Sequence, residues 1–246
     1  MTAKPPSIPP LLAICFALAA VSTASIFIRY AQQDAPSLVI AAGRLTTASL
    51  VLAPLAWLRH RAELIALSKR QWLLAGLSGV FLAIHFATWI TSLEFTTVAS
   101  SAVLVSTTPM WVAVFTPIFL KEKVRRAVLV GMAVALAGGV IIGLSDMCSL
   151  GGDGLTCPDL ATLTQGKAFL GNLLALAGAW AATGYFLIGR RLRERMSMIS
   201  YVSVVYTIAA IVLIGWMFAA GHKPWGLPPR AYLWIALLGL VPQLIG

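Results

Sequence analysis

The sequence predicts an all-α polytopic membrane protein, a bundle of transmembrane helices. Of its 246 residues, 59% are hydrophobic and 11% are charged, and the mean hydropathy is +0.89, whereas soluble domains carry roughly 25% charged residues. Apolar stretches of about 20 residues, the length of a helix across a ~30 Å hydrocarbon core, recur along the chain. Short polar connectors join these stretches and leave no room for a soluble domain.

Eight apolar stretches are expected to cross the bilayer as helices. The first follows MTAKPPSIPP; it is too long for the core of a signal peptide and has no clear small-residue cleavage site, so we expect it to be retained. The eight predicted helices span residues 11–30, 37–58, 71–93, 97–120, 126–146, 168–189, 198–220 and 231–246.

The basic residues indicate how these helices are oriented. The net charge is +10, and Lys and Arg concentrate in every second connector, which the positive-inside rule places in the cytoplasm. We therefore expect a multi-pass protein of the inner (plasma) membrane with a cytoplasmic N-terminus. Nucleic acid is not an expected partner, because these charges form no single basic face. The groups are Lys4; Arg59, Arg61, Lys69 and Arg70; Lys121, Lys123, Arg125 and Arg126; and Arg190, Arg191, Arg193 and Arg195.

The stretch 37–58 contains one charged residue, Arg44. Insertion scales assign roughly 2.5–3.5 kcal/mol to an arginine at the centre of a span, so Arg44 must face a polar cavity, find a partner or reach the interface. It lies about 10 Å along the helix from Ser37. Snorkelling to the outer surface is therefore the alternative to a cavity position.

The stretch 71–93 carries a polar stripe. Phe81, His85, Thr88, Trp89 and Ser92 recur at helical spacing and can share one face. A lone histidine among apolar residues is more often a packing residue than a functional one, but the mixture with a tryptophan and hydroxyls also favours a cavity. Both interpretations are open for His85, and His85 and Trp89 are candidates for solute contact.

The stretch 97–120 contains a helix breaker beside three hydroxyls: Ser106, Thr107, Thr108 and Pro109. Proline lacks an N–H, so the bond to the Val105 carbonyl is lost and the helix should bend there. The hydroxyls either bond their own helix backbone or line a cavity near the bilayer midplane, where secondary transporters commonly bind substrate. On the second interpretation Ser106, Thr107 and Pro109 are substrate-binding candidates.

Glycines dominate the stretch 126–146, with one GxxxG at Gly139 and Gly143. Small residues let helices approach closely in lipid. Packing between repeats is the first interpretation and a homodimer through this helix is the second.

The connector that follows holds Cys148 and Cys157 in MCSLGGDGLTCPD. The charge rule places it outside the cell membrane, where disulfides persist. A disulfide that restrains this loop and a pair of free thiols are both open. A metal site is not expected, because no histidine is near to complete a zinc shell.

The later helices add two further candidates, Trp180 and Tyr206. Aligning the chain with itself at an offset of 162 places LLAICFALAA (11–20) on LLALAGAWAA (173–182) and Arg44 on Tyr206. An offset of 160 places RQWLLAGLSG (70–79) on RAYLWIALLG (230–239). Chance likeness between Leu/Ala-rich helices competes with a true repeat, but the helix order is kept as well. Because five helices separate the copies, the repeat is inverted across the bilayer.

The repeat predicts three regions: a first five-helix repeat at 1–146, an extracytoplasmic connector at 147–167 and a second repeat at 168–246. A complete second repeat would contain five helices, whereas only three are present. We therefore expect eight of ten transmembrane helices in this chain, which makes a non-transporting fragment or assembly partner one alternative.

Two motifs resemble the EamA-type members of the drug/metabolite transporter superfamily. They are AAGRLTTASLVL (41–52) and SLEFTTVASSAVLVSTTPMWVAVFTPIFLKEK (92–123), which ends in a Glu-Lys pair at Glu122. The resemblance implies ten helices in two inverted five-helix repeats, and export of amino acids or related metabolites.

The leading functional hypothesis is a secondary transporter that moves a small organic solute by alternating access. The eight acidic residues lie in connectors or at helix ends, so no mid-membrane carboxylate is available for proton coupling. A membrane enzyme is the less favoured alternative, because the three histidines are scattered and form no set with acidic residues. No cofactor is expected, since the chain has no GxxxxGK[ST] nucleotide motif. The expected partners are the substrate and the lipid bilayer.

Overall fold

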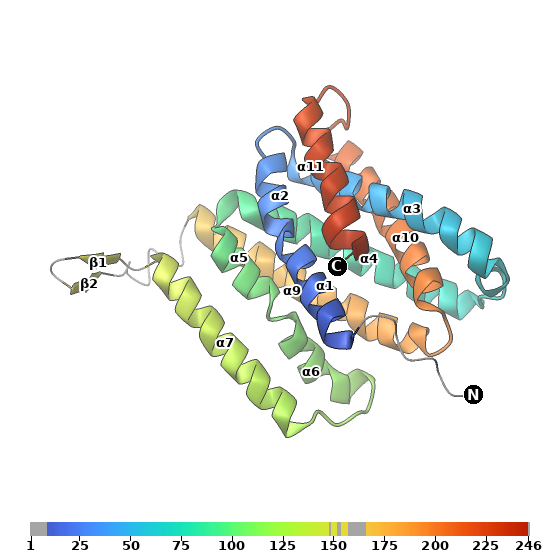
Figure 1. Cartoon of the computed structure of the whole chain (residues 1–246), viewed down its shortest axis with the longest axis horizontal. Helices are drawn as coiled ribbons and strands as arrows, with labels where there is room; N and C mark the ends of the chain where they lie inside the picture. Colours follow the sequence, from blue (N-terminus) through green and yellow to red (C-terminus); the bar gives the residue numbers. More distant parts are fainter. Residues whose placement is uncertain (1–8, 148, 152–153, 157–165, 246) are drawn as a thin grey trace.

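The chain folds into a bundle of α-helices with one short hairpin (Figure 1). The computed structural model describes residues 9–147, 149–151, 154–156 and 166–245. Its elements are α1 (Pro10–Ser22), α2 (Ala24–Ala31), α3 (Ser37–Ile65), α4 (Lys69–Phe95), α5 (Val98–Val105), α6 (Thr108–Phe119), α7 (Arg126–Met147), β1 (Ser149–Gly151), β2 (Gly154–Thr156), α9 (Lys167–Arg193), α10 (Met198–Ala219), α11 (Pro229–Leu240) and a π-helix (Val241–Ile245).

Six of the eight predicted stretches are long and apolar enough to cross a membrane: Leu11–Ala31, Ser37–Ile65, Lys69–Phe95, Val98–Phe119, Lys167–Arg193 and Met198–Ala219. The other two are shorter apolar helices within the described residues, Arg126–Ile141 and Pro229–Ile245. Large apolar side chains such as Leu50, Leu73 and Ile211 are exposed around the bundle, as a lipid-facing surface requires. The prediction of an all-α polytopic bundle is confirmed.

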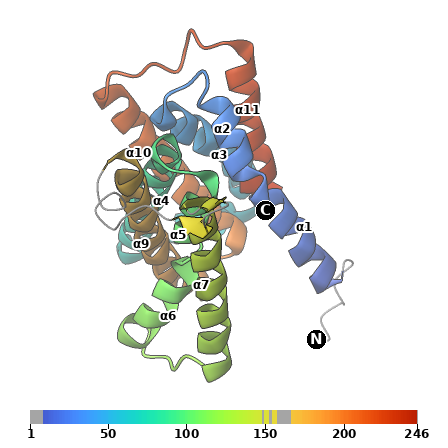
Figure 2. The same cartoon turned by 90° about the vertical axis from the view of Figure 1, so that its left-hand side faces the viewer.

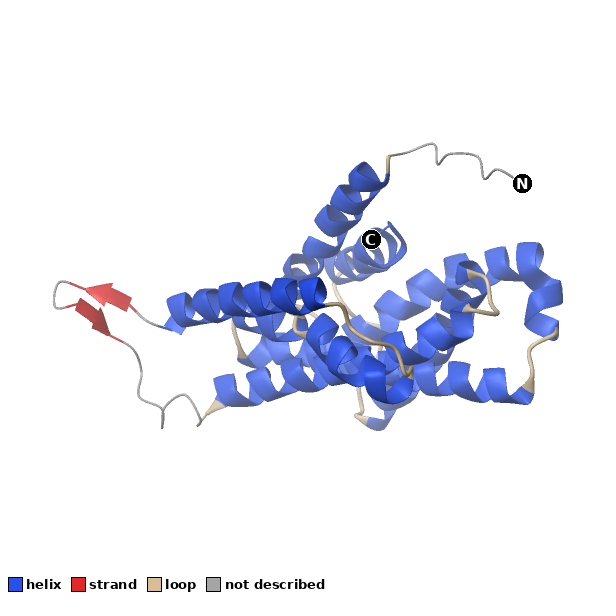
Figure 3. Cartoon of the chain, turned by 90° about the horizontal axis from the view of Figure 1, so that it is seen from below, coloured by secondary structure: helices blue, strands red, loops and turns tan. Residues whose placement is uncertain are grey.

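Three predicted stretches are interrupted. Residues 11–30 form α1 and α2, with a break at Thr23, whose hydroxyl donates to the Ala20 carbonyl at 2.7 Å; such back-bonding by threonine often bends helices. Residues 97–120 form α5 and α6, and residues 231–246 end in the π-helix. The connector 147–167 contains the antiparallel β1–β2 hairpin, which stands beyond the end of α7 in Figure 3.

Helices α4 and α9 form the centre of the bundle and pack along each other. Helix α10 packs on α3 and α4, and α11 packs on α2 and α3. Helices α5 and α6 lie on α9, and α7 packs mainly on α5 and α6. The main described contacts of α7 are therefore within residues 1–146, and its packing between the predicted repeats stays a prediction. Figure 2 shows α1 projecting away from the other helices.

Small residues set the closeness of the central helices. A Cβ added at Gly178 of α9 would lie 3.1 Å from Thr88 Oγ1 and 3.4 Å from the His85 carbonyl oxygen of α4. At the start of α9, a Cβ on Gly171 would lie 2.9 Å from the Thr96 backbone nitrogen. The contact at Gly171 is with main chain at the turn after α4, which cannot rotate aside.

Replacing Gly171 with Ala is expected to destabilise the protein by about 1–3 kcal/mol, because overpacking exceeds the ~1 kcal/mol that alanine gains in a helix. The control is Gly215→Ala in α10, where nothing lies within 4 Å of the added Cβ. Unfolding of both variants in detergent measures the difference. Equal stability of the two variants would show that α9 is not tightly packed against the turn after α4 at Gly171.

Candidate functional site

Arg44 lies inside the bundle, in the first half of α3. Its side chain is 4% exposed. The guanidinium carbon lies 4.3 Å from the ring centroid of Phe86 and 5.8 Å from that of Trp89, both on α4, which are cation–π distances. Its Nε donates to Oε1 of Gln243 at 2.8 Å. Arg44 therefore does not snorkel; it is held between α4 and the π-helix.

Two hydrogen-bond donors in this region lack partners. Nη1 of Arg44 and Nε1 of Trp89 are buried, and neither has a hydrogen-bond partner among the described residues. Burying a polar group without a partner costs roughly 1–3 kcal/mol, more for a charged group, so native structures keep few such groups. Both atoms are donors, so the group that would satisfy them is an acceptor, and the charge of Arg44 favours an anion.

His85 orients this region. Its Nδ1 lies 2.9 Å from the Gly178 carbonyl oxygen of α9, and because a carbonyl only accepts, Nδ1 carries the proton. The imidazole stacks on Trp89 at 5.6 Å and meets Phe86 edge-on at 4.7 Å. His85 thus joins α4 to α9 and fixes the two rings that face Arg44.

Tyr206 of α10 completes the group. It is partly buried, and its hydroxyl lies near Gln243, the residue that accepts from Arg44. The next residue, Thr207, pairs with Ser49 of α3 at 2.6 Å and holds α10 against α3. The structure therefore brings together four predicted site residues, Arg44, His85, Trp89 and Tyr206. With Phe86 and Gln243 they form the central polar cluster.

The hydroxyls at the break between α5 and α6 bond their own backbone. The Thr108 hydroxyl donates at 2.7 Å to the Val105 carbonyl, the group that Pro109 leaves without its helical N–H. The Thr107 hydroxyl donates to the Leu104 carbonyl at 2.6 Å and accepts from Nε1 of Trp111 at 3.1 Å. Thr107 and Thr108 thus bond their own helix backbone, the first alternative drawn from the sequence, while Thr108 and Pro109 also line a pocket.

Trp180 lies beside Trp111, near the break between α5 and α6, and does not belong to the central polar cluster. Its ring meets Trp111 edge-on at 5.4 Å, and it is 50% exposed. It lines an apolar pocket of about 500 Å³ with Phe81 and Phe115. Ser106 is also exposed.

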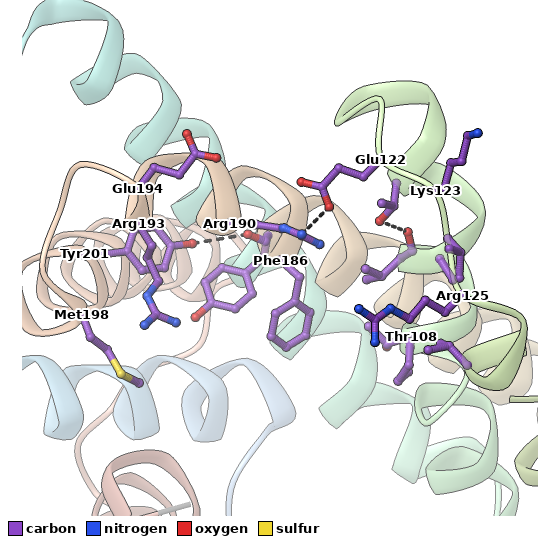
Figure 4. A pocket seen from close by; sticks show the side chains of 18 of the residues that line it. Thr108, Glu122, Lys123, Arg125, Phe186, Arg190, Arg193, Glu194, Met198 and Tyr201 are labelled. Atoms are coloured by element: carbon purple, nitrogen blue, oxygen red, sulfur yellow. Dashed lines mark hydrogen bonds and ion pairs between the residues drawn. The ribbon is translucent and has the colours of Figure 1, made fainter. Parts of the chain in front are cut away.

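A larger pocket of about 1050 Å³ opens where α6, α7, α9 and α10 meet (Figure 4). Pro109 and Thr108 contribute to its wall. The basic residues around it belong to the α6–α7 connector and the end of α9, and the Arg190–Glu122 ion pair spans these two segments. Arg44, Trp89 and Gln243 do not line it.

Sequence reasoning missed Gln243 and the role of Phe86. The signal that singled out Thr107 and Pro109, a polar residue beside a proline in an apolar stretch, also occurs in LVPQLIG and could have found Gln243. Phe86 carries no such signal.

Cys148 and Cys157 lie outside the described residues, while Cys15 on α1 is an exposed free thiol. In the part of the chain that the structure describes, no group of three or more His, Cys, Asp or Glu side chains could hold a metal ion.

Comparison with known proteins agrees with this architecture. The model of the EamA-like transporter family matches residues 8–144, more than half of the chain. A solved structure described only as the crystal structure of a protein is similar with a TM-score of 0.66 and 18% sequence identity, over 94% of this chain and 74% of that one. No curated protein matches. At this identity the structural likeness concerns the fold alone.

The chain belongs to the EamA-like transporter family. It is therefore a multi-pass membrane protein of a transporter family within the drug/metabolite superfamily, a family of transporters and not of enzymes.

Replacing Thr108 with Val should cost about 1–3 kcal/mol of stability, because it leaves the Val105 carbonyl unpaired inside the membrane. In a Pro109→Ala background the same change should cost much less, since the N–H of residue 109 then serves that carbonyl. Unfolding of the two single variants and the double variant in detergent measures this coupling. Additive effects would mean that Thr108 does not substitute for the missing N–H.

Proposed function

We propose that this protein carries a small organic solute with a free carboxylate, an amino acid or related metabolite, across the inner membrane by alternating access. The observation that supports the proposal is the pair of unpartnered buried donors, Nη1 of Arg44 and Nε1 of Trp89. A carboxylate has two oxygens and binds an arginine through charge-assisted hydrogen bonds. A cation would find a repelling charge at the same position.

The surroundings suit an amino acid further. Phe86 and Trp89 offer ring faces to an apolar part of the solute. Tyr206 and Gln243 offer oxygens that could accept from an ammonium group. Few polar groups within a mainly apolar wall are typical of small-molecule sites.

Two inverted repeats, 1–146 and 168–246 with the connector 147–167, fit the packing. Gly79 of α4 approaches Ile208 of α10, where an added Cβ would meet Cγ2 at 2.6 Å. At the aligned position of the second repeat, Gly239 of α11 approaches Thr47 of α3, where a Cβ added to Gly239 would lie 2.6 Å from the Cβ of Thr47. The α4–α10 contact and the α11–α3 contact are thus equivalent, with the two proposed repeats exchanged. A two-fold axis in the membrane plane would produce such a pair of contacts.

An ion pair joins helices at each end of the bundle, which supports alternating access. Arg230 at the start of α11 donates twice to Asp34 in the α2–α3 turn, at 2.6 Å each. Arg190 near the end of α9 pairs with Glu122 in the α6–α7 connector at the opposite end. Exposed ion pairs contribute little stability. The Arg190–Glu122 pair is exposed on both sides and can break at little cost, whereas Asp34 in the other pair is largely buried.

The basic connectors favour a cytoplasmic position for the N-terminus and for the Arg190–Glu122 end. The proposal includes a homodimer through α7. The face of α7 around Gly131 and Gly138 is open, with nothing within 4 Å of an added Cβ, and Val130 and Val134 beside it are exposed.

Replacing Arg44 with Gln should remove charge-assisted bonds worth about 1.5–3 kcal/mol, or roughly 10- to 150-fold in Kd for a carboxylate-bearing solute. Trp89→Phe, which removes only the indole N–H, should weaken binding roughly 2- to 10-fold. Binding and counterflow of a panel of amino acids in proteoliposomes measure both effects, and each methyl ester, which has no carboxylate, should bind wild type and Arg44→Gln alike.

The matched control is Trp72→Phe, because Trp72 is 46% exposed on the lipid side of α4. If Arg44→Gln weakens binding of the esters as much as binding of the free amino acids, Arg44 does not recognise the carboxylate. Solute binding without counterflow in the wild-type chain would favour the non-transporting alternative.

Orientation is checked with Ala66→Cys after α3 and Ala220→Cys after α10, each exposed, in a background with Cys15, Cys148 and Cys157 replaced by Ser. An impermeant maleimide on intact cells should label residue 220, and should label residue 66 only after permeabilisation. The reverse pattern would overturn the proposed orientation.

A further inference from the structure

The 1050 Å³ pocket between α6, α7, α9 and α10 carries an excess of positive charge. Its lining includes four cations, Lys123, Arg125, Arg190 and Arg193, and two carboxylates, Glu122 and Glu194, for a net charge of +2. Arg190 is neutralised by Glu122. In the described residues Arg125 and Arg193 form no ion pair, and they extend from opposite sides of the pocket with Phe186 between them (Figure 4).

The wall below this charged rim is apolar. Pro109, Val112, Val128, Phe186 and Val202 line it, and Val128 and Phe186 are 49% and 52% exposed. The charged residues occupy a connector and a helix end, where the bilayer meets water, whereas Pro109 lies about three turns back along α6, near the start of that helix. The pocket therefore offers cations at the interface and apolar surface at acyl-chain depth.

Two tyrosines separate this pocket from the central polar cluster. Tyr201, 2% exposed, pairs with Ser78 of α4 at 2.8 Å and donates to the Tyr185 carbonyl at 3.3 Å. The two tyrosine rings stack at 6.0 Å. The pocket is also large for an amino acid, since drug-sized ligands occupy roughly 300–1,000 Å³.

We infer that this pocket binds an anionic phospholipid, with its phosphate headgroup between Arg125 and Arg193 and its chains along Phe186 and Val202. Basic pockets between transmembrane helices at the cytoplasmic face suit phosphate-bearing headgroups. Arginine forks bind phosphate oxygens in pairs, and the apolar wall accounts for the preference for a lipid over a free phosphate.

The test uses the whole chain, purified in detergent, and counts bound lipid by native mass spectrometry with phosphatidylglycerol or phosphatidylcholine added. Wild type should retain phosphatidylglycerol preferentially. The double variant Arg125→Gln/Arg193→Gln should retain roughly 30-fold less phosphatidylglycerol, because each arginine near an anionic headgroup contributes about fivefold in affinity. Inorganic phosphate should not displace the lipid.

The matched control is Arg59→Gln/Arg70→Gln, which removes two exposed arginines from the same end of the bundle, outside the pocket. It should retain the lipid as wild type does. Equal loss in both double variants, no preference for phosphatidylglycerol, or displacement by millimolar inorganic phosphate would each overturn the inference.

Discussion

Burial of a single guanidinium constrains the centre of this protein. Arg44 is placed in a helix too apolar and too tightly packed to let it reach water, so its charge must be met inside the bundle. Phe86 and Trp89 supply ring faces and Gln243 supplies one oxygen. These partners come from α4 and the π-helix, so the position of Arg44 depends on the packing of three segments far apart in the sequence.

The central helix α4 serves both packing and the candidate site. His85 bonds the Gly178 carbonyl, where the missing Cβ lets α9 approach. The rings next to His85, Phe86 and Trp89, face Arg44. A rotation of α4 would therefore alter the α4–α9 contact and the arginine environment together. In the proposed alternating-access mechanism, this coupling would change the site when the two proposed repeats move.

Much of the architecture follows from the sequence. Hydropathy alone predicts the membrane spans, because a lipid core forces nearly every backbone group into helical hydrogen bonds over a fixed length. The proline at residue 109 predicts the break between α5 and α6. Interruptions made by side-chain bonding, as at Thr23, leave a fainter signal, since threonine is common in unbroken helices as well.

The sequence by itself determined the class of protein, its helices and the polar residues that lipid could not accept unaided. The tertiary structure alone decided which of these residues meet: Arg44, His85, Trp89 and Tyr206 converge, whereas Thr107 and Trp180 join through Trp111 elsewhere. The reason is that helix periodicity fixes a residue's face on its own helix, but partners across helices depend on rotation and crossing, which packing at glycines such as Gly178 sets.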